Sequence, residues 1–147
     1  MKATKQQGFT LIELIVVIVI LGILSATALP RFVDLGSDAR RAVLAGVDGS
    51  MRSANNMVYG KAAATGQLTG AGTISAVGVN VTTAFGYAAD ATELNRVMEV
   101  TGNVSLVGTA FQVTGGSAPG NCQIVYAPST GANVLPTYTS TGGGSGC

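Results

Sequence analysis

The sequence predicts an α+β protein, in which a long N-terminal helix precedes a head built mainly from antiparallel strands. An apolar run from Gly8 to Pro30 and an amphipathic run after it predict the helix. Short segments that alternate apolar and polar residues between glycine and proline turns predict the sheet. At 147 residues, the chain has room for one ordinary domain besides this helix.

The apolar run is long enough to cross a membrane. As a helix, the residues from Phe9 to Leu29 rise about 31 Å, close to the thickness of a bilayer's hydrocarbon core. Lys2 and Lys5 precede the run without any acid. The positive-inside tendency therefore places the N-terminus in the cytoplasm and the residues after Pro30 outside.

Glu13 separates two interpretations of this run. A secretory signal has a similar layout, and Ala26-Thr27-Ala28 offers it a cleavage site before Leu29. A carboxylate within the apolar segment of a disposable signal costs insertion free energy and contributes nothing in return. The charge therefore indicates a segment that is kept and used.

The residues around Glu13 resemble the type III signal of type IV pilins and their pseudopilin relatives. Gly8-Phe9-Thr10-Leu11-Ile12-Glu13-Leu14 follows a short basic leader and precedes the apolar run to Pro30. The resemblance implies that a prepilin peptidase cuts between Gly8 and Phe9, and that the new Phe9 amine is methylated. It also assigns the Glu13 carboxylate to the Phe9 ammonium of a neighbouring subunit, an attraction that is strong in low dielectric. The structural alternative is a helix capping box made by Thr10 and Glu13.

Beyond Pro30, apolar side chains recur at helical spacing and extend the predicted helix to about Ala63. They are Val43, Val47, Met51, Ala54 and Val58. Asp48 and Arg52 stand at i,i+4 on another face, as a solvated ion pair. A helix break is expected at Gly22 and Pro30, because glycine is a poor helix former and Pro30 cannot donate to the carbonyl of Ala26. In pilins this segment unwinds in the filament, and the resemblance implies the same for Leu21 to Pro30.

The head lacks charge over long stretches. From Ala62 to Ala89 no residue is charged, and Thr73 to Val81 is expected to form loop and strand. Asp90-Ala91-Thr92-Glu93 predicts the start of a short helix that continues to about Val100. The later strands are predicted in SLVGTAFQV and CQIVYAP, and no residue after Val100 is charged.

Two cysteines, Cys122 and Cys147, bracket the neutral C-terminal segment. In the oxidising compartment that the topology predicts, they most simply form one disulfide. By resemblance, the loop 122–147 corresponds to the D-region of pilins, the part most exposed on the filament.

Composition argues against catalysis and against nucleic acid. The chain has no histidine, a net charge of +1 and no long basic run, so neither a catalytic triad nor a phosphate-tracking surface is expected. No metal site and no cofactor are expected either. Carboxylates are absent from the stretch after Val100. This weakens the interpretation as a secretion pseudopilin, whose relatives often hold calcium there.

The absence of catalytic patterns predicts a non-enzymatic protein, and the resemblance to type IV pilins implies a self-assembling subunit with four parts. They are a leader (1–8), an apolar membrane and filament-core helix (9–30), an amphipathic helix (31–63) and a glycine-rich α+β head (64–147). The segments ALPRFVDLGSDARRAVLAGVDGS and SANNMVYGKA are similar to mannose-sensitive haemagglutinin pilins, which implies a major pilin in a type IV pilus used for attachment. The partners implied are other copies of the chain, the prepilin peptidase, the pilus assembly machinery and surface or host glycans.

The precursor would lie in the inner membrane and the product in an extracellular filament. Three alternatives remain: a type II secretion pseudopilin, a minor pilin, and a secreted globular binding domain with a cleavable signal.

Overall fold

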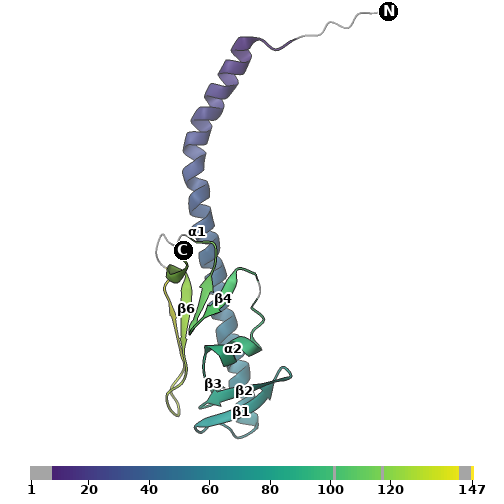
Figure 1. The fold of residues 1–147 in the computed structure, drawn as a ribbon, viewed down its shortest axis with the longest axis vertical. Coiled ribbons are helices and arrows are strands. Elements are labelled where there is room, and N and C mark those ends of the chain that lie inside the picture. The colour runs from purple at the N-terminus through teal and green to yellow at the C-terminus, as the bar shows by residue number, and fades with distance from the viewer. Residues whose placement is uncertain (1–7, 101, 117, 143–146) are drawn as a thin grey trace, which may run out of the picture. The chain divides into compact units, whose positions relative to one another are not determined.

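A computed structural model describes residues 8–100, 102–116, 118–142 and 147. The chain forms two compact units, Met1–Gly36 and Ser37–Cys147. The helix α1, Leu11–Ala64, contributes residues to both units. In the second unit it is joined by a short helix and seven strands, so the predicted α+β class is confirmed (Figure 1).

The helix α1 ends in a hydrogen-bonded turn at Gly66. Gly66 has φ of 71°, a conformation that glycine adopts without steric cost. Its N–H donates to the carbonyl of Ala63 (3.2 Å), and the Gln67 N–H donates to the carbonyl of Ala62 (2.8 Å). This pair of bonds is the Schellman motif, which satisfies carbonyls that the end of a helix leaves unpaired.

The apolar stripe of α1 packs against the head from residue 44 onward. Its buried members recur every three or four residues: Leu44, Val47, Met51, Ala54, Val58 and Ala62. The prediction was wrong at Val43, which is 44% exposed. The first buried residue of this stripe is instead Leu44, which lies three positions before Val47 and therefore on the same face of the helix.

The first sheet has three antiparallel strands in the order β1-β2-β3, with bounds Ala71–Ala76, Val79–Ala84 and Tyr87–Ala88. The segment expected as loop and strand from Thr73 to Val81 is therefore a hairpin. Val77 and Gly78 form its turn, with φ of 50° and 78°. Positive φ at both turn residues matches the right-handed twist of paired strands.

The helix α2, Ala91–Val97, begins where the sequence predicts, at Asp90. The Asp90 side chain accepts a hydrogen bond from the Glu93 N–H at 2.8 Å, which confirms the predicted N-cap. The helix ends earlier than expected, since Met98 is already extended with ψ of 137°.

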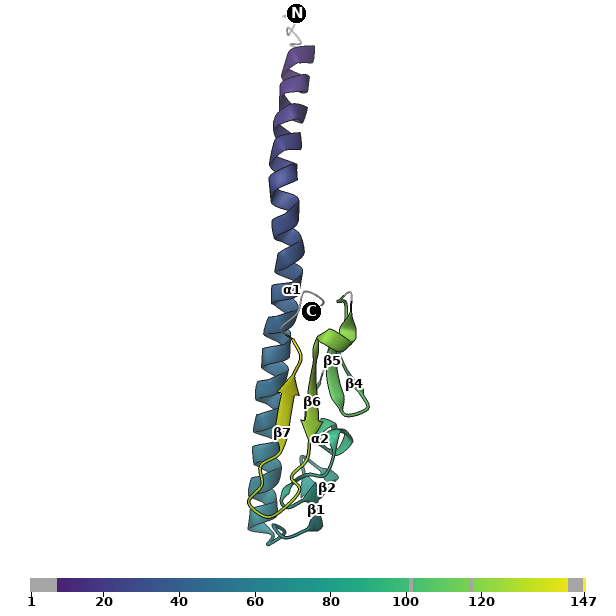
Figure 2. The same cartoon turned by 90° about the vertical axis from the view of Figure 1, so that its left-hand side faces the viewer.

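The second sheet has four antiparallel strands in the order β4-β5-β6-β7. Their bounds are Val104–Val107, Ala110–Val113, Gln123–Ala127 and Thr137–Ser140, and the 3-10 turn η1, Pro119–Asn121, precedes β6. The stretch SLVGTAFQV thus contains a hairpin. Figures 1 and 2 show this sheet beside the part of α1 that belongs to the second unit.

The core of the second unit lies between this sheet and α1. Phe111, Ile124 and Tyr126 from the sheet pack with Leu44 and Met51 of the helix in one buried cluster. A second cluster joins Val58 and Ala62 of α1 to the first sheet through Ile74 and Val81. The head therefore packs on α1 from Leu44 to Ala62, as the amphipathic pattern predicts.

Candidate processing and assembly site

The predicted cleavage position precedes α1. Gly8, Phe9 and Thr10 have no regular secondary structure, and the Phe9 side chain is 94% exposed. A peptide bond in such an exposed, non-helical segment is accessible to a peptidase. The residues before Gly8 lie outside the described part of the chain.

Thr10 and Glu13 form the capping box that the sequence offered as the structural alternative. The Thr10 N–H donates to Glu13 Oε2 at 2.8 Å, and the Thr10 hydroxyl donates to the same oxygen at 2.7 Å. In return, the Glu13 N–H donates to Thr10 Oγ1 at 3.4 Å. The carboxylate is thereby held at the positive end of α1, where a negative charge is stabilised.

The capping box leaves part of the Glu13 carboxylate available. Both hydrogen bonds from Thr10 go to Oε2, and Oε1 has no partner among the described residues. An ionised carboxylate can accept several hydrogen bonds. Capping within one chain and pairing with an ammonium of another chain are therefore chemically compatible.

The part of α1 that follows is apolar and uncovered. Leu11–Leu29 has a mean hydropathy of 2.7 over its best window, none of which is buried. Phe9, Ile12, Val16 and Val17 surround Glu13 in a shallow hollow. The Thr27 hydroxyl donates to the Leu24 carbonyl at 2.9 Å, so it is satisfied within the helix. This segment is suited to a bilayer or to apolar helices of other chains.

The expected helix break at Gly22 and Pro30 is not present in the isolated chain. The helix α1 is continuous from Leu11 to Ala64 and passes through both residues. Proline removes one helix hydrogen bond and crowds the carbonyl of the residue four positions earlier, which can bend a helix without ending it. Unwinding of Leu21 to Pro30 on assembly remains a prediction.

The predicted disulfide joins Cys122 and Cys147, and both residues are buried. It ties the C-terminal residue to the start of β6 across a separation of 25 residues. The Arg40 Nε–H on α1 donates to the Cys147 carbonyl oxygen. The disulfide and this hydrogen bond together connect the C-terminal residue to the sheet and to α1.

The sequence did not reveal a buried polar network around Asn55 of α1. Its side-chain Nδ2 donates to the hydroxyls of Tyr126 (2.9 Å) and Tyr138 (2.8 Å). Its Oδ1 accepts from the Ala88 N–H at 2.9 Å, and the Tyr126 hydroxyl donates to the Ala88 carbonyl at 2.7 Å. One amide thus joins α1 to both sheets. A polar asparagine at a helix position between the apolar residues Met51 and Val58 is the one feature of the sequence that could have indicated this network.

Burial changes the acidity of the tyrosines in this network. It raises the pKa of Tyr126 to about 12, and it also raises the pKa of Tyr138. In both cases the apolar surroundings disfavour the charged phenolate. The network is therefore built from neutral hydroxyls.

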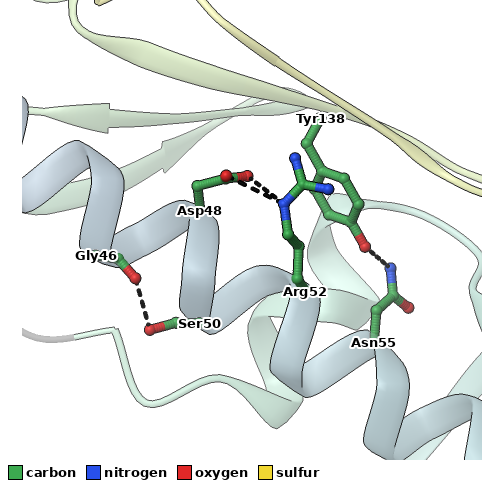
Figure 3. Close-up of polar contacts among 6 residues, drawn as sticks. All are labelled: Gly46, Asp48, Ser50, Arg52, Asn55 and Tyr138. Atoms are coloured by element: carbon green, nitrogen blue, oxygen red, sulfur yellow. Dashed lines mark hydrogen bonds and ion pairs between the residues drawn. The ribbon is translucent and has the colours of Figure 1, made fainter.

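The predicted ion pair of Asp48 and Arg52 is present, and it has an additional partner. Arg52 Nε lies 3.0 Å from Oδ1 and 3.1 Å from Oδ2 of Asp48. Figure 3 shows the guanidinium over the ring of Tyr138, with its central carbon 4.4 Å from the ring centroid. In the same view, the Ser50 hydroxyl donates to the Gly46 carbonyl at 3.0 Å. Arg52 therefore joins α1 to β7 through cation–π contact.

The acids of α2 have structural partners. Asp90 caps the helix, and Glu93 Oε2 accepts from the Thr82 N–H of β2 at 2.9 Å. Within the described residues, no three histidine, cysteine, aspartate or glutamate side chains gather as a metal site would require. The Asp90 side chain has the capping role that the sequence predicts, whereas the Glu93 side chain joins α2 to β2.

A model of the prokaryotic N-terminal methylation motif matches residues 3–29. The chain has a type IV prepilin signal. This signal contains Gly8, Phe9 and Glu13 in the expected order, and its apolar part coincides with the uncovered start of α1.

The chain is also similar to a curated pilin. It is 54% identical over 50 residues to the type IV narrow pilus major component PilA5 of Thermus thermophilus. The match covers 34% of this chain and 43% of the relative, which is less than half of either protein. No solved structure matches the chain. The similarity therefore supports homology to a type IV pilin, without a match to the mannose-sensitive haemagglutinin subtype.

Proposed function

We propose that the protein is a subunit of a type IV pilus. The observation that carries this proposal is the uncovered apolar helix Leu11–Leu29, which begins at Glu13's capping box and directly follows the candidate cleavage bond. A helix of this kind is stable in a bilayer and, outside it, needs apolar cover. Copies of the same helix can supply that cover in a filament.

In this mechanism, a prepilin peptidase cuts between Gly8 and Phe9, and the Phe9 amine is methylated. The new ammonium of one subunit meets the Glu13 carboxylate of the next, whose Oε1 is available. In an apolar filament core an unpaired carboxylate is costly, so the pair favours one axial register. The ion pair therefore fixes the axial position of one subunit relative to the next, more than it raises the affinity between them.

The proposed division of the chain follows from this assembly. Residues 1–8 are the leader, 9–30 the membrane and filament-core segment, 31–63 the amphipathic helix and 64–147 the head. The precursor lies in the inner membrane, and the head faces solvent in the extracellular filament. The absence of charged residues after Val100 makes contacts between heads apolar and hydrogen-bonded, so they should tolerate salt.

Attachment is the proposed use of the filament, with the mannose-sensitive haemagglutinin pilins as the proposed subtype. Support for the subtype comes from the sequence around ALPRFVDLGSDARRAVLAGVDGS. Surface glycans are the proposed partners of the head, and the assembly machinery is the proposed partner of the precursor.

Intact mass of the extracellular chain tests the processing step. A chain that begins at Phe9, is heavier by one methyl group and gains two hydrogens on reduction supports the proposal. A chain that begins near Leu29 contradicts it and favours a disposable signal. Short fibres whose heads melt at a lower temperature with a chelator would instead indicate a secretion pseudopilin.

Glu13→Gln tests the register pair separately from the capping box. The amide oxygen of glutamine can still accept the bonds from Thr10, while the negative charge is lost. We expect normal cleavage and methylation but few or irregular filaments. Glu99→Gln is the matched control, because Glu99 is an exposed acid in the head. Regular filaments from Glu13→Gln in normal amount would contradict the register mechanism.

A further inference from the structure

A small pocket lies on the head where α1, β3 and the start of β7 meet. Its volume is about 180 Å³, and its lining residues are Arg52, Asn56, Tyr87, Leu135, Pro136 and Tyr138. All of them belong to the second unit and are far from the N-terminal segment in sequence. The proposed filament mechanism does not use this pocket.

The Arg52 guanidinium presents unused donors to the pocket. Its Nε binds both carboxylate oxygens of Asp48. Figure 3 shows the guanidinium, with its two Nη atoms, over the ring of Tyr138. Neither Nη has a hydrogen-bond partner within residues 8–100, 102–116, 118–142 and 147. The ion pair and the ring contact hold the guanidinium in place, so its donors are already oriented.

The Tyr138 hydroxyl is a second donor. It accepts a hydrogen bond from Asn55 Nδ2 at 2.8 Å, but its own hydrogen has no acceptor among the described residues. Tyr126 differs, because its hydroxyl both accepts from Asn55 and donates to the Ala88 carbonyl. The unused hydrogen of Tyr138 is therefore available to a ligand in the pocket.

The rest of the lining complements these donors. The Asn56 amide and the Tyr87 hydroxyl have no hydrogen-bond partner in the part of the chain that the structure describes. Leu135 and Pro136 supply an apolar wall, and Leu135 is 69% exposed. Tyr87 is stacked on Tyr59 with ring centroids 4.7 Å apart, which fixes its position. The pocket thus combines several oriented donors with one apolar side.

We propose that this pocket binds the carboxylate of a small ligand with a body about the size of one sugar ring, such as a hexuronate. Paired Nη donors match the two oxygens of a carboxylate, and this bidentate geometry is specific to arginine. The apolar wall and the tyrosine rings can cover the C–H face of the ring. The pocket is open to solvent on one side, so its volume of about 180 Å³ describes the part of the ligand that the protein covers. Because Asp48 already offsets part of the arginine charge, the expected Kd is in the millimolar range.

The test is a titration of the full chain in detergent micelles, followed through nitrogen-15 NMR signals. D-glucuronate is the probe, and D-glucose is the control ligand because it has the same ring without the carboxylate. We expect saturable shifts of the Arg52 Nε–H and Asn56 side-chain signals with glucuronate. Glucose should leave them unchanged at the same concentrations.

Variants identify the donors. Arg52→Gln should weaken glucuronate binding at least tenfold, and Tyr138→Phe should weaken it several-fold while keeping the ring. Arg41→Gln is the matched control, because Arg41 also pairs with an acid on α1, Asp38, but does not line the pocket. Thermal melting of each variant shows whether the head remains folded.

Three results would overturn the proposal. One is the absence of saturable shifts with glucuronate in the wild-type chain. A second is equal binding of glucose, which would remove the role of the carboxylate. The third is unchanged binding by folded Arg52→Gln. Self-association that depends on Arg52, without glucuronate binding, would assign the pocket to an acidic side chain of a second copy.

Discussion

Replacing Asn55 by alanine should strongly destabilise the head. The substitution leaves the Ala88 N–H without its acceptor and removes both donors that bind Tyr126 and Tyr138. A buried N–H without a partner costs about 1 to 3 kcal/mol, and each lost hydrogen bond contributes about 1 kcal/mol. Tyr138 can turn to water, whereas Tyr126 is almost fully buried.

The expected loss is therefore about 2 to 4 kcal/mol of the free energy of unfolding. At about 4 °C per kcal/mol for a domain of this size, the melting temperature should fall by about 8 to 16 °C. Tyrosine fluorescence and near-ultraviolet circular dichroism can follow urea unfolding, since the chain has no tryptophan. Both signals report on the tyrosines of the network.

The neighbouring residue provides a matched control. Asn56 is exposed, so Asn56→Ala should change the free energy of unfolding by less than about 0.5 kcal/mol. A double-mutant cycle of Asn55→Ala with Tyr126→Phe should give a coupling energy of about 0.5 kcal/mol or more. If Asn55→Ala unfolds at the same urea concentration as Asn56→Ala, the network does not stabilise the head as argued.

Further predictions concern acidity, turn geometry, the disulfide and the helix. The pKa of Tyr126 is raised to about 12 from 10.0, so the head should lose stability as the pH rises from 10 through 12, and Tyr126→Phe should flatten that loss in pH-dependent melting. Val77→Asn should raise the free energy of unfolding by about 1 kcal/mol and shift the urea midpoint upward, because Val77 has φ of 50° and asparagine tolerates that conformation better; an unchanged midpoint would argue against strain there. Replacing Cys122 and Cys147 by serine should cost about 3 to 4 kcal/mol in the same assay. Amides of residues 21–30 should exchange faster in the filament than in micelles, and full protection in the filament would contradict unwinding.

Sequence patterns predicted the features that depend on residues close together in the chain. The amphipathic spacing predicted the buried face of α1 except at Val43, and Asp90 predicted the cap of α2. Thr10 and Glu13 lie three residues apart, so their capping box could be anticipated from the sequence alone. Two cysteines left a single pairing within the chain. Each of these inferences needs only helical geometry, local chemistry or elimination.

Hairpin turns were harder to predict. Val77–Gly78 lacks the asparagine or aspartate that usually signals such a turn, so the sequence predicts loop and strand from Thr73 to Val81 without placing the turn between two paired strands. The structure separates β1 from β2 because their pairing satisfies the backbone of both strands. Local sequence preference was overridden by the pairing of whole strands.

The sequence by itself determined the membrane-length helix, the position of Glu13 near its start, the α+β class and the disulfide. The tertiary structure alone decided which distant groups meet. Asn55 lies far along the chain from Tyr126 and Tyr138, and Arg52 reaches β7 only because the sheet packs on α1. Contacts of this kind depend on the packing of whole elements, and a local pattern has no information about their register.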